Sequence, residues 1–144
     1  MRVSHIALYA EDLRAAENFY ARVFAAELLF REAVDGDGVW HTLPLSAGWD
    51  DATAVGIRVD LVVLRRDDLV LPVFAGRSSP RIIGLDVAAE EIEAMRARLP
   101  DQAHVLAEGE ARLVFVDPFG VQWQVSAAAA FRSSGEIHGR WLPL

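Results

Sequence analysis

The sequence contains no cysteine, which excludes disulfide bonds, thiol nucleophiles and cysteine-ligated zinc. It also lacks a dense basic stripe: 14 basic residues stand against 21 acidic ones, and the formal net charge is −7. A nucleic acid is therefore not an expected partner, because phosphate backbones are bound by surfaces rich in arginine and lysine. No apolar run is long enough to cross a bilayer and no charged-then-apolar leader precedes the first predicted strand, so we expect a cytoplasmic protein that does not enter membranes.

The residues that are present suffice for a folded core. Of the 144 residues, 53% are hydrophobic and 24% are charged, which is typical of one compact domain or of two small modules that share one core. The acidic balance, taken alone, favours cationic or neutral ligands.

Residues 114–126 show the clearest local pattern in the chain. An apolar segment leads into Asp117-Pro-Phe-Gly120, where proline fixes φ and Gly120 can take a positive φ, so a tight turn is expected. After the turn, apolar and polar residues alternate, which predicts a strand with Gln122 and Gln124 on the face opposite its apolar side chains. A strand of this kind can line a pocket with a polar floor.

Two weak internal repeats indicate that the chain has related halves. In the first repeat, residues 4–9 resemble residues 81–86, and each is a short apolar strand that leads into a helix. This match places His5 opposite Ile82.

The second repeat links residues 56–61 to residues 120–125, each a glycine followed by alternating apolar and polar residues. This match places Asp60 opposite Gln124. Two strand starts and two strand ends in the same order predict two β-α-β-β-β halves, and two copies are too few for a solenoid.

Periodicity along the chain predicts an α+β fold with this order. Strands are expected at residues 3–9, 27–34, 39–45, 56–64, 81–87, 104–108, 111–117 and 121–126, and helices at residues 13–24 and 89–99. Asp12 is a good N-cap for the first helix, on which Glu17 is expected to face water. Asp35-Gly-Asp-Gly38 predicts a hairpin, and residues 46–55 are expected to form a loop.

The boundaries of these segments predict one domain over residues 1–126, composed of module 1 (1–66), a linker (67–80) and module 2 (81–126). A C-terminal extension follows at residues 127–144. The extension is too apolar for a free solvated tail, so we expect it to pack on the domain or on a second subunit.

Three segments resemble the vicinal oxygen chelate superfamily, which includes glyoxalase I, the bleomycin-resistance proteins and the extradiol dioxygenases. They are Ser4-His-Ile-Ala-Leu-Tyr-Ala-Glu-Asp-Leu13 with Asn18-Phe-Tyr20, the second strand start at Arg81, and Asp117-Pro-Phe-Gly-Val-Gln-Trp-Gln124. The resemblance covers residues 1–126. It implies two βαβββ modules whose mixed sheets curl around a ligand cavity, usually in a homodimer.

In the metal-using members of this superfamily, the first and last strands of each module supply the ligands, usually histidine and glutamate. The resemblance carries these positions to His5, Asp60, Ile82 and Gln124. Isoleucine cannot bind a metal, and the amide of Gln124 is a weaker ligand than glutamate. We therefore expect no metal cofactor; a divalent ion, if one binds, would be held by His5, Asp60 and Gln124.

Asp60 has a structural interpretation beside its functional one. A carboxylate between apolar strand residues needs a partner, and Arg58 lies on the same face two residues earlier, so we expect the two to pair. Gln122 and Gln124 are expected to hydrogen-bond a ligand or water, because amides do not titrate.

The four tryptophans divide into two groups. Trp123 and Trp141 are expected in the core, whereas Trp40 and Trp49 lie near a hairpin and a loop and could stack on a planar ligand. His41 is next to Trp40 on an expected strand, so at most one of these two side chains should face the cavity.

These observations predict a homodimeric small-molecule binding protein that resembles the bleomycin-resistance proteins and has no catalytic metal. Its ligand would contact His5, Trp40, Trp49, Asp60, Gln122 and Gln124. One alternative is a glyoxalase-like lyase or isomerase, in which a divalent metal polarises a substrate oxygen. Another is a dimeric interaction module with no pocket function.

Overall fold

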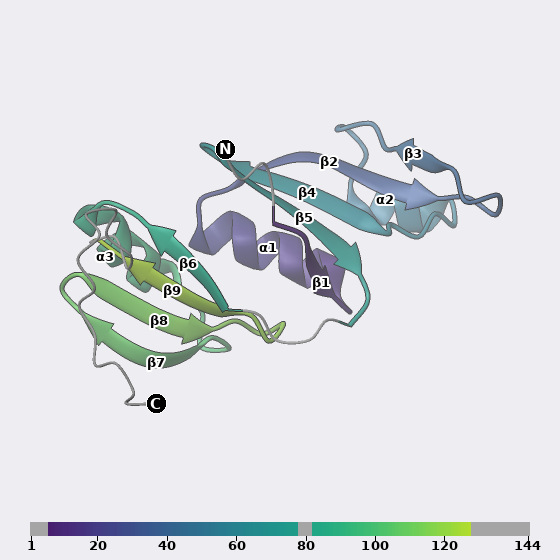
Figure 1. Cartoon of the computed structure of the whole chain (residues 1–144). Helices are drawn as coiled ribbons and strands as arrows, with labels where there is room; N and C mark the ends of the chain where they lie inside the picture. The colour runs from purple at the N-terminus through teal and green to yellow at the C-terminus, as the bar shows by residue number, and fades with distance from the viewer. Residues whose placement is uncertain (1–5, 78–81, 128–144) are drawn as a thin grey trace, which may run out of the picture.

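The computed structural model describes residues 6–77 and 82–127, which form two mixed β-sheets and three helices (Figure 1). Both halves follow one β-α-β-β-β plan, so the predicted α+β class with two such modules is confirmed. No helix in this described part is both long enough and apolar enough to cross a bilayer. The predictions for His5, Trp141 and the extension from residue 128 onward lie outside the described residues.

Module 1 contains a five-stranded sheet. Its elements are β1 (Leu8–Ala10), α1 (Leu13–Val23), β2 (Glu27–Val34), β3 (Trp40–Thr42), α2 (Trp49–Ala54), β4 (Leu61–Arg66) and β5 (Leu69–Ala75). The strands lie in the order β1-β5-β4-β2-β3. The β1–β5 pair is parallel, and the other neighbours are antiparallel.

Module 2 contains a four-stranded sheet with the same plan. Its elements are β6 (Ile82–Asp86), α3 (Ala89–Arg98), β7 (His104–Gly109), β8 (Arg112–Val116) and β9 (Gln122–Ser126). The strand order is β6-β9-β8-β7, with β6 and β9 parallel, so these strands take the places of β1, β5, β4 and β2. Glu110 and Ala111 join β7 to β8, where module 1 has the additional elements β3 and α2.

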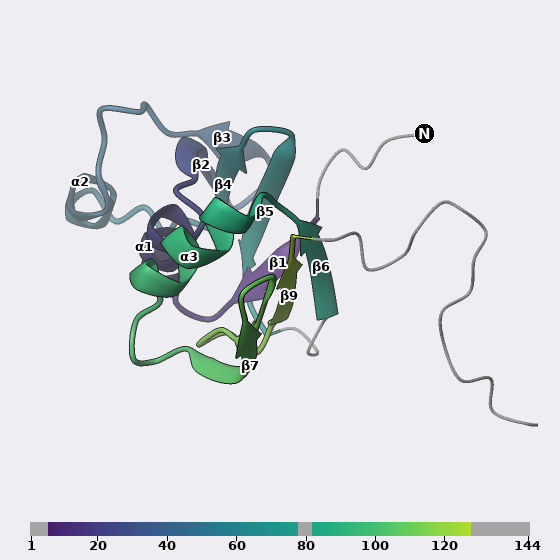
Figure 2. The same cartoon turned by 90° about the vertical axis from the view of Figure 1, so that its left-hand side faces the viewer.

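The helices α1 and α3 lie between the two sheets (Figures 1 and 2). Apolar residues of both sheets and of both helices form one buried cluster. Within it, the ring of Phe24, which follows α1, lies 4.6 Å from that of Trp123 on β9 and 6.5 Å from that of Phe115 on β8, measured between centroids. Trp123 is fully buried, as its sequence pattern predicts.

Strand side chains alternate between the two faces of a sheet, so each sheet has one face that does not pack on the helices. Because the helices lie between the sheets, these two faces point away from each other. We call these the outer faces. Tyr9 and Phe74 are paired across β1 and β5 on the outer face of module 1, opposite the buried Leu8. On β9 of module 2, Gln122 and Gln124 alternate with buried residues and therefore lie on its outer face.

Local chemistry sets the start and the buried face of α1. The side chain of Asp12 accepts a hydrogen bond from the backbone N–H of Ala15 at 2.9 Å, which confirms it as the N-cap. The predicted orientation of Glu17 toward water is wrong, because this residue is 9% exposed. Its carboxylate accepts bonds from Nη2 and Nε of Arg31 at 2.6 and 2.8 Å, and this distant partner is not visible in the local sequence.

The segment predicted as a linker between the modules contains a strand. Leu69–Ala75 forms β5, the last strand of module 1, and pairs with both β1 and β4. Pro72 suggested a break because proline has no N–H to donate. The β1–β5 register starts after this residue, at Leu8 and Val73, so the ladder accommodates the proline.

The position of β5 corrects the second sequence repeat. Tyr9 pairs with Phe74 in module 1, and Asp86 pairs with Ser126 in module 2. The first repeat matches Tyr9 with Asp86, so their strand partners Phe74 and Ser126 are equivalent as well. Gln124 lies two residues before Ser126, and its counterpart is therefore Pro72, two residues before Phe74. Asp60, which precedes β4, is not equivalent to Gln124.

The connections between strands include one short helix that was not predicted and two turns that were. Residues 46–55, predicted as a loop, contain the short helix α2, in which Asp51 accepts a hydrogen bond from the backbone N–H of Gly48 at 2.7 Å. The tight turn is confirmed, with Gly120 at φ 87° and its N–H donating to the carbonyl of Asp117 at 3.1 Å. The Asp35–Gly38 hairpin between β2 and β3 is confirmed as well.

Candidate functional site

A pocket with a volume of about 1190 Å³ lies in module 1. We call it the module 1 pocket. Its walls come from the ends of β1 and β5, the start of α1, the β2–β3 hairpin, α2 and residues 56–60. The side chains that line it include Tyr9, Trp40, Trp49, Arg58, Asp60 and Phe74.

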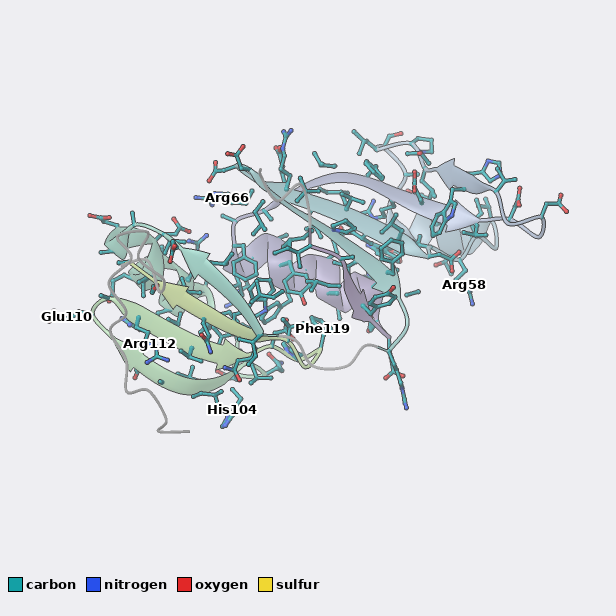
Figure 3. All side chains as sticks on the ribbon, in the orientation of Figure 1. Arg58, Arg66, His104, Glu110, Arg112 and Phe119 are labelled. Carbon is teal, nitrogen blue, oxygen red and sulfur yellow. The ribbon has the colours of Figure 1, made fainter. Side chains whose placement is uncertain are left out.

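One wall of the pocket is specific to module 1. The chain from β3 to β4 contributes α2 and residues 56–60, whereas Glu110 and Ala111 are all that joins β7 to β8 in module 2. Figure 3 shows Arg58 at the far end of the first sheet, away from Arg112 and His104 of module 2. The pocket is therefore a feature added to the repeated β-α-β-β-β plan.

Three aromatic rings form a partly exposed wall of the pocket. Tyr9 and Phe74 have ring centroids 5.6 Å apart, and the rings of Trp40 and Phe74 meet edge to face at 6.2 Å. Tyr9 is 42% exposed and Trp40 is 45% exposed. Exposed aromatic surface in a concave site offers contact area to an apolar or planar ligand.

Asp60 and Arg58 form the ion pair that the sequence predicts. Oδ1 of Asp60 lies 3.0 Å from Nε and 2.8 Å from Nη2 of Arg58. Oδ2 accepts a hydrogen bond from the backbone N–H of Val34 at 3.0 Å. The Asp60 side chain is 11% exposed, whereas that of Arg58 is 86% exposed, so the pair places a guanidinium at the pocket surface on a buried carboxylate.

Trp49 lines the pocket, but its indole ring also contacts buried side chains behind the pocket wall. Its Nε1 donates to Oε2 of Glu17 at 3.0 Å, and the guanidinium of Arg31 lies 5.3 Å from its ring centroid. Arg31 also donates to the carbonyl of Ala47 at 3.2 Å. This buried cluster fixes α2 against α1 and β2, so Trp49 acts mainly as a support for the pocket wall.

The hairpin histidine faces a different hollow. Trp40 lines the module 1 pocket and His41 does not, which agrees with the expectation that at most one of them faces it. Nε2 of His41 lies 2.6 Å from Oδ2 of Asp35. The hydrogen bonds from His41 and from the backbone N–H of Val39 lower the pKa of the Asp35 carboxyl.

The structure separates the predicted site residues. Trp40, Trp49 and Asp60 line the module 1 pocket, whereas Gln122 and Gln124 lie half-buried on β9 in module 2. Within one chain these groups cannot face one cavity, because the two outer faces point in different directions (Figure 2).

The described residues do not fit a metal site. Across residues 6–77 and 82–127, no three histidine, aspartate or glutamate side chains gather closely enough to bind one ion. Both oxygens of Asp60 already accept hydrogen bonds, and Gln124 lies on the other sheet. Ile82, 67% exposed on β6 and paired with Gln122, offers no donor atom.

No protein-family model matches the chain, and no curated protein matches it in sequence. Solved structures match in fold. One is FosX, the genomically encoded fosfomycin resistance protein of Listeria monocytogenes, which was crystallised as a glutamate-to-glutamine mutant with Mn(II) and dihydroxypropylphosphonic acid. It is 18% identical to this chain with a TM-score of 0.62, and the alignment covers 90% of this chain and 93% of FosX.

Two further structures show the same likeness. FosX from Mesorhizobium loti is 13% identical with a TM-score of 0.56, covering 90% of this chain and 93% of its own. TioX from Micromonospora sp. ML1 is 15% identical with a TM-score of 0.57, covering 88% and 98%. The chain has the vicinal oxygen chelate fold. These identities establish the fold alone, because one fold supports many activities.

The sequence alone did not assign Tyr9, Phe74 or Arg58 to this pocket. Phe74 carries no local signal, because its strand β5 lies in the segment predicted as a linker. Tyr9 carried a usable signal, since it alternates with the buried Leu8 on an expected strand. Arg58 was identified only as the partner of Asp60.

Proposed function

We propose that this chain is a small-molecule binding protein whose ligand occupies the module 1 pocket. One observation supports this most strongly: exposed aromatic rings of Tyr9 and Trp40 line a pocket of about 1190 Å³. Exposed aromatic side chains gathered in a concave site mark binding surfaces more often than isolated exposed residues do. The ion pair of Arg58 and Asp60 adds a few polar groups that can orient the ligand.

We further propose that binding requires no metal, in the manner of the bleomycin-resistance proteins. The chemistry of the donors supports this: Ile82 and Pro72 have none, Gln124 offers an amide, and Asp60 is committed to Arg58 and Val34. The rival is a metal-dependent lyase or isomerase of the same fold, since the related FosX was crystallised with Mn(II).

The protein would act as a homodimer in the cytoplasm. The outer faces point apart within one chain, so Gln122 and Gln124 can reach the ligand of module 1 only if a second copy supplies them. Exposed apolar side chains on both outer faces, Tyr9 in module 1 and Ile82 in module 2, favour such an association.

Screening for ligands tests the proposal. Thermal unfolding of the purified full chain is measured with a library of small aromatic molecules, and dissociation constants are measured for those that raise the midpoint. We expect ligands with Kd below about 100 μM, and Trp40→Ala should weaken them at least about tenfold. Trp49→Phe serves as the comparison variant, because a phenylalanine ring at this position should keep most of the pocket wall in place.

Elemental analysis of the same preparation separates the binder from the metal enzyme. We expect well under one Mn, Fe, Ni or Zn per chain, and no change in ligand affinity when these ions are added or chelated. One tightly held metal per chain, or ligand binding that depends on it, would favour the lyase or isomerase instead. Absence of any ligand affected by Trp40→Ala would remove the pocket's proposed function.

A further inference from the structure

Asp60, whose own position is fixed by the sheet, holds the side chain of Arg58 in one orientation. The Nε of Arg58 donates a hydrogen bond to Oδ1 of Asp60 at 3.0 Å, and its Nη2 lies 2.8 Å from the same oxygen. Asp60 in turn is tied to β2 and β5 by three hydrogen bonds: Oδ2 accepts from the N–H of Val34, its own N–H donates to the carbonyl of Glu32, and its carbonyl accepts from the N–H of Ala75. The carboxylate therefore cannot move without disturbing the sheet, and the guanidinium is positioned before any ligand arrives.

The outer edge of the Arg58 guanidinium has N–H donors that are free to bind a ligand. The Arg58 side chain is 86% exposed, and no described residue accepts a hydrogen bond from its Nη1. A guanidinium offers parallel N–H groups that match the two oxygens of a carboxylate or a similar oxyanion. A preorganised arginine with an open edge thus suits an acidic group on a ligand.

The acidic groups of the same pocket are already engaged. Glu11 pairs with Arg77, and the side chain of Asp12 accepts from the N–H at the start of α1. Both oxygens of Asp60 are occupied as described. The net charge of the chain favours a cationic ligand, but the carboxylates that line this pocket all have partners, whereas Arg58 has unused donors.

The aromatic wall of the pocket is connected through the strands to the residues around Asp60. Trp40 pairs with Val34 across β2 and β3, and the N–H of Val34 is the group that binds Asp60. Phe74, in edge-to-face contact with Trp40, pairs with Leu61, which follows Asp60 directly. The rings and the guanidinium therefore line the same pocket.

From this arrangement we propose that the ligand of the module 1 pocket is an aromatic acid: a planar ring placed against Trp40 and Phe74, with a carboxylate or comparable oxyanion bound by Arg58. Asp60 is a positioning residue for that arginine. The inference rests on the proposed small-molecule function and narrows it to one chemical class.

Three probes of one ring system test the class: 2-naphthoate, 2-naphthylmethanol and 2-naphthylmethylammonium, titrated calorimetrically into the full chain at low ionic strength. The naphthoate should bind about tenfold more tightly than the ammonium, because a charge-assisted hydrogen bond is gained. Arg58→Gln should remove that preference and leave the alcohol within about twofold. Arg22→Gln, an exposed arginine of α1 outside the pocket, should leave all three affinities unchanged.

The outcomes separate the two claims. If Trp40→Ala weakens all three probes but the ammonium binds as well as the naphthoate, or Arg58→Gln leaves naphthoate binding intact, the acid class is wrong and the pocket remains a binding site. If none of the probes binds at about 1 mM, a level that corresponds to roughly 4 kcal/mol, the aromatic-acid class is contradicted, and the library screen decides separately whether the pocket binds ligands.

Discussion

The hydroxyl of Tyr20 on α1 donates a hydrogen bond to Oδ2 of Asp117 at 2.7 Å, and this contact joins the two modules inside the core. Asp117 is 3% exposed. The same oxygen accepts from Nε1 of Trp123 at 2.8 Å, and Oδ1 accepts from the backbone N–H groups of Phe119 and Val121, both at 2.9 Å. Four donors thus satisfy one buried carboxylate, and the turn before β9 is fixed to α1.

Removal of the Tyr20 hydroxyl should destabilise the fold by a measurable amount. We expect Tyr20→Phe to lower the free energy of unfolding by about 1–2 kcal/mol, since a buried carboxylate loses one of its donors. Urea unfolding followed by far-UV circular dichroism measures this. Tyr9→Phe is the matched control, expected within about 0.5 kcal/mol because its ring lies at the surface. Equal stability of the two variants would contradict the importance of the contact.

Tyr20 should also make stability depend on pH in the alkaline range. Burial, the charge of Asp117 and the hydrogen bond to it together raise the pKa of Tyr20 well above its ordinary value. The folded chain keeps this proton where the unfolded chain releases it, so the contribution is complete below about pH 10 and is lost as pH rises further.

The sequence makes this pH effect easy to isolate. The chain has two tyrosines and no lysine, so tyrosine is the side chain that titrates between about pH 9 and 11.5. Above pH 10 the unfolding free energy of the wild type should fall by up to about 1.4 kcal/mol per pH unit more steeply than that of Tyr20→Phe. Parallel curves for the two proteins would show that Tyr20 is not the group responsible.

The ion pair beneath the pocket wall gives a third prediction. Glu17→Ala leaves Arg31 buried without its carboxylate, and we expect a loss of about 3–5 kcal/mol in urea unfolding. The double variant Glu17→Leu with Arg31→Met should recover most of this loss, because no uncompensated charge remains. If the double variant is as unstable as Glu17→Ala, packing of Trp49 rather than the buried charge determines stability here.

A fourth prediction tests the proposed homodimer. Ile82 is 67% exposed on the outer face of module 2, and in the proposed dimer Ile82→Glu should raise the dissociation constant at least about tenfold by placing a charge between the subunits. Analytical ultracentrifugation gives the constant. Leu45→Glu, equally apolar and 68% exposed but in the loop before α2, is the control. A wild type that sediments as a monomer would rule out the shared site.

Local chemistry explains which parts of the fold were predictable. The turn that starts at Asp117, the hairpin after β2 and the Asp12 N-cap all depend on residues within a few positions of each other. Strand β5 was missed because Pro72 signals a break locally, and only the register with β1 shows that its missing N–H is tolerated. Glu17 was misplaced for a related reason, since Arg31 lies on a different element.

The candidate site also contains residues that local sequence signals identify and others whose position depends on tertiary packing. Trp40 and Trp49 could be selected from residue type and position, and the Arg58 partner of Asp60 from spacing alone. Asp60 itself was selected through a repeat that the strand register corrects. No local signal placed Gln122 and Gln124 on a sheet that faces away from these residues. Their separation follows from the packing of α1 and α3 between the sheets, which depends on contacts such as that of Phe24 with Trp123.

The most direct test of the account is fluorine NMR of the full chain labelled with 5-fluorotryptophan, its four resonances assigned by single substitutions of tryptophan by phenylalanine. During a titration with 2-naphthoate, the Trp40 resonance should shift in a saturable manner while that of the buried Trp123 stays in place. A titration that leaves Trp40 unchanged, or that shifts Trp123 in its stead, would contradict ligand binding in the module 1 pocket.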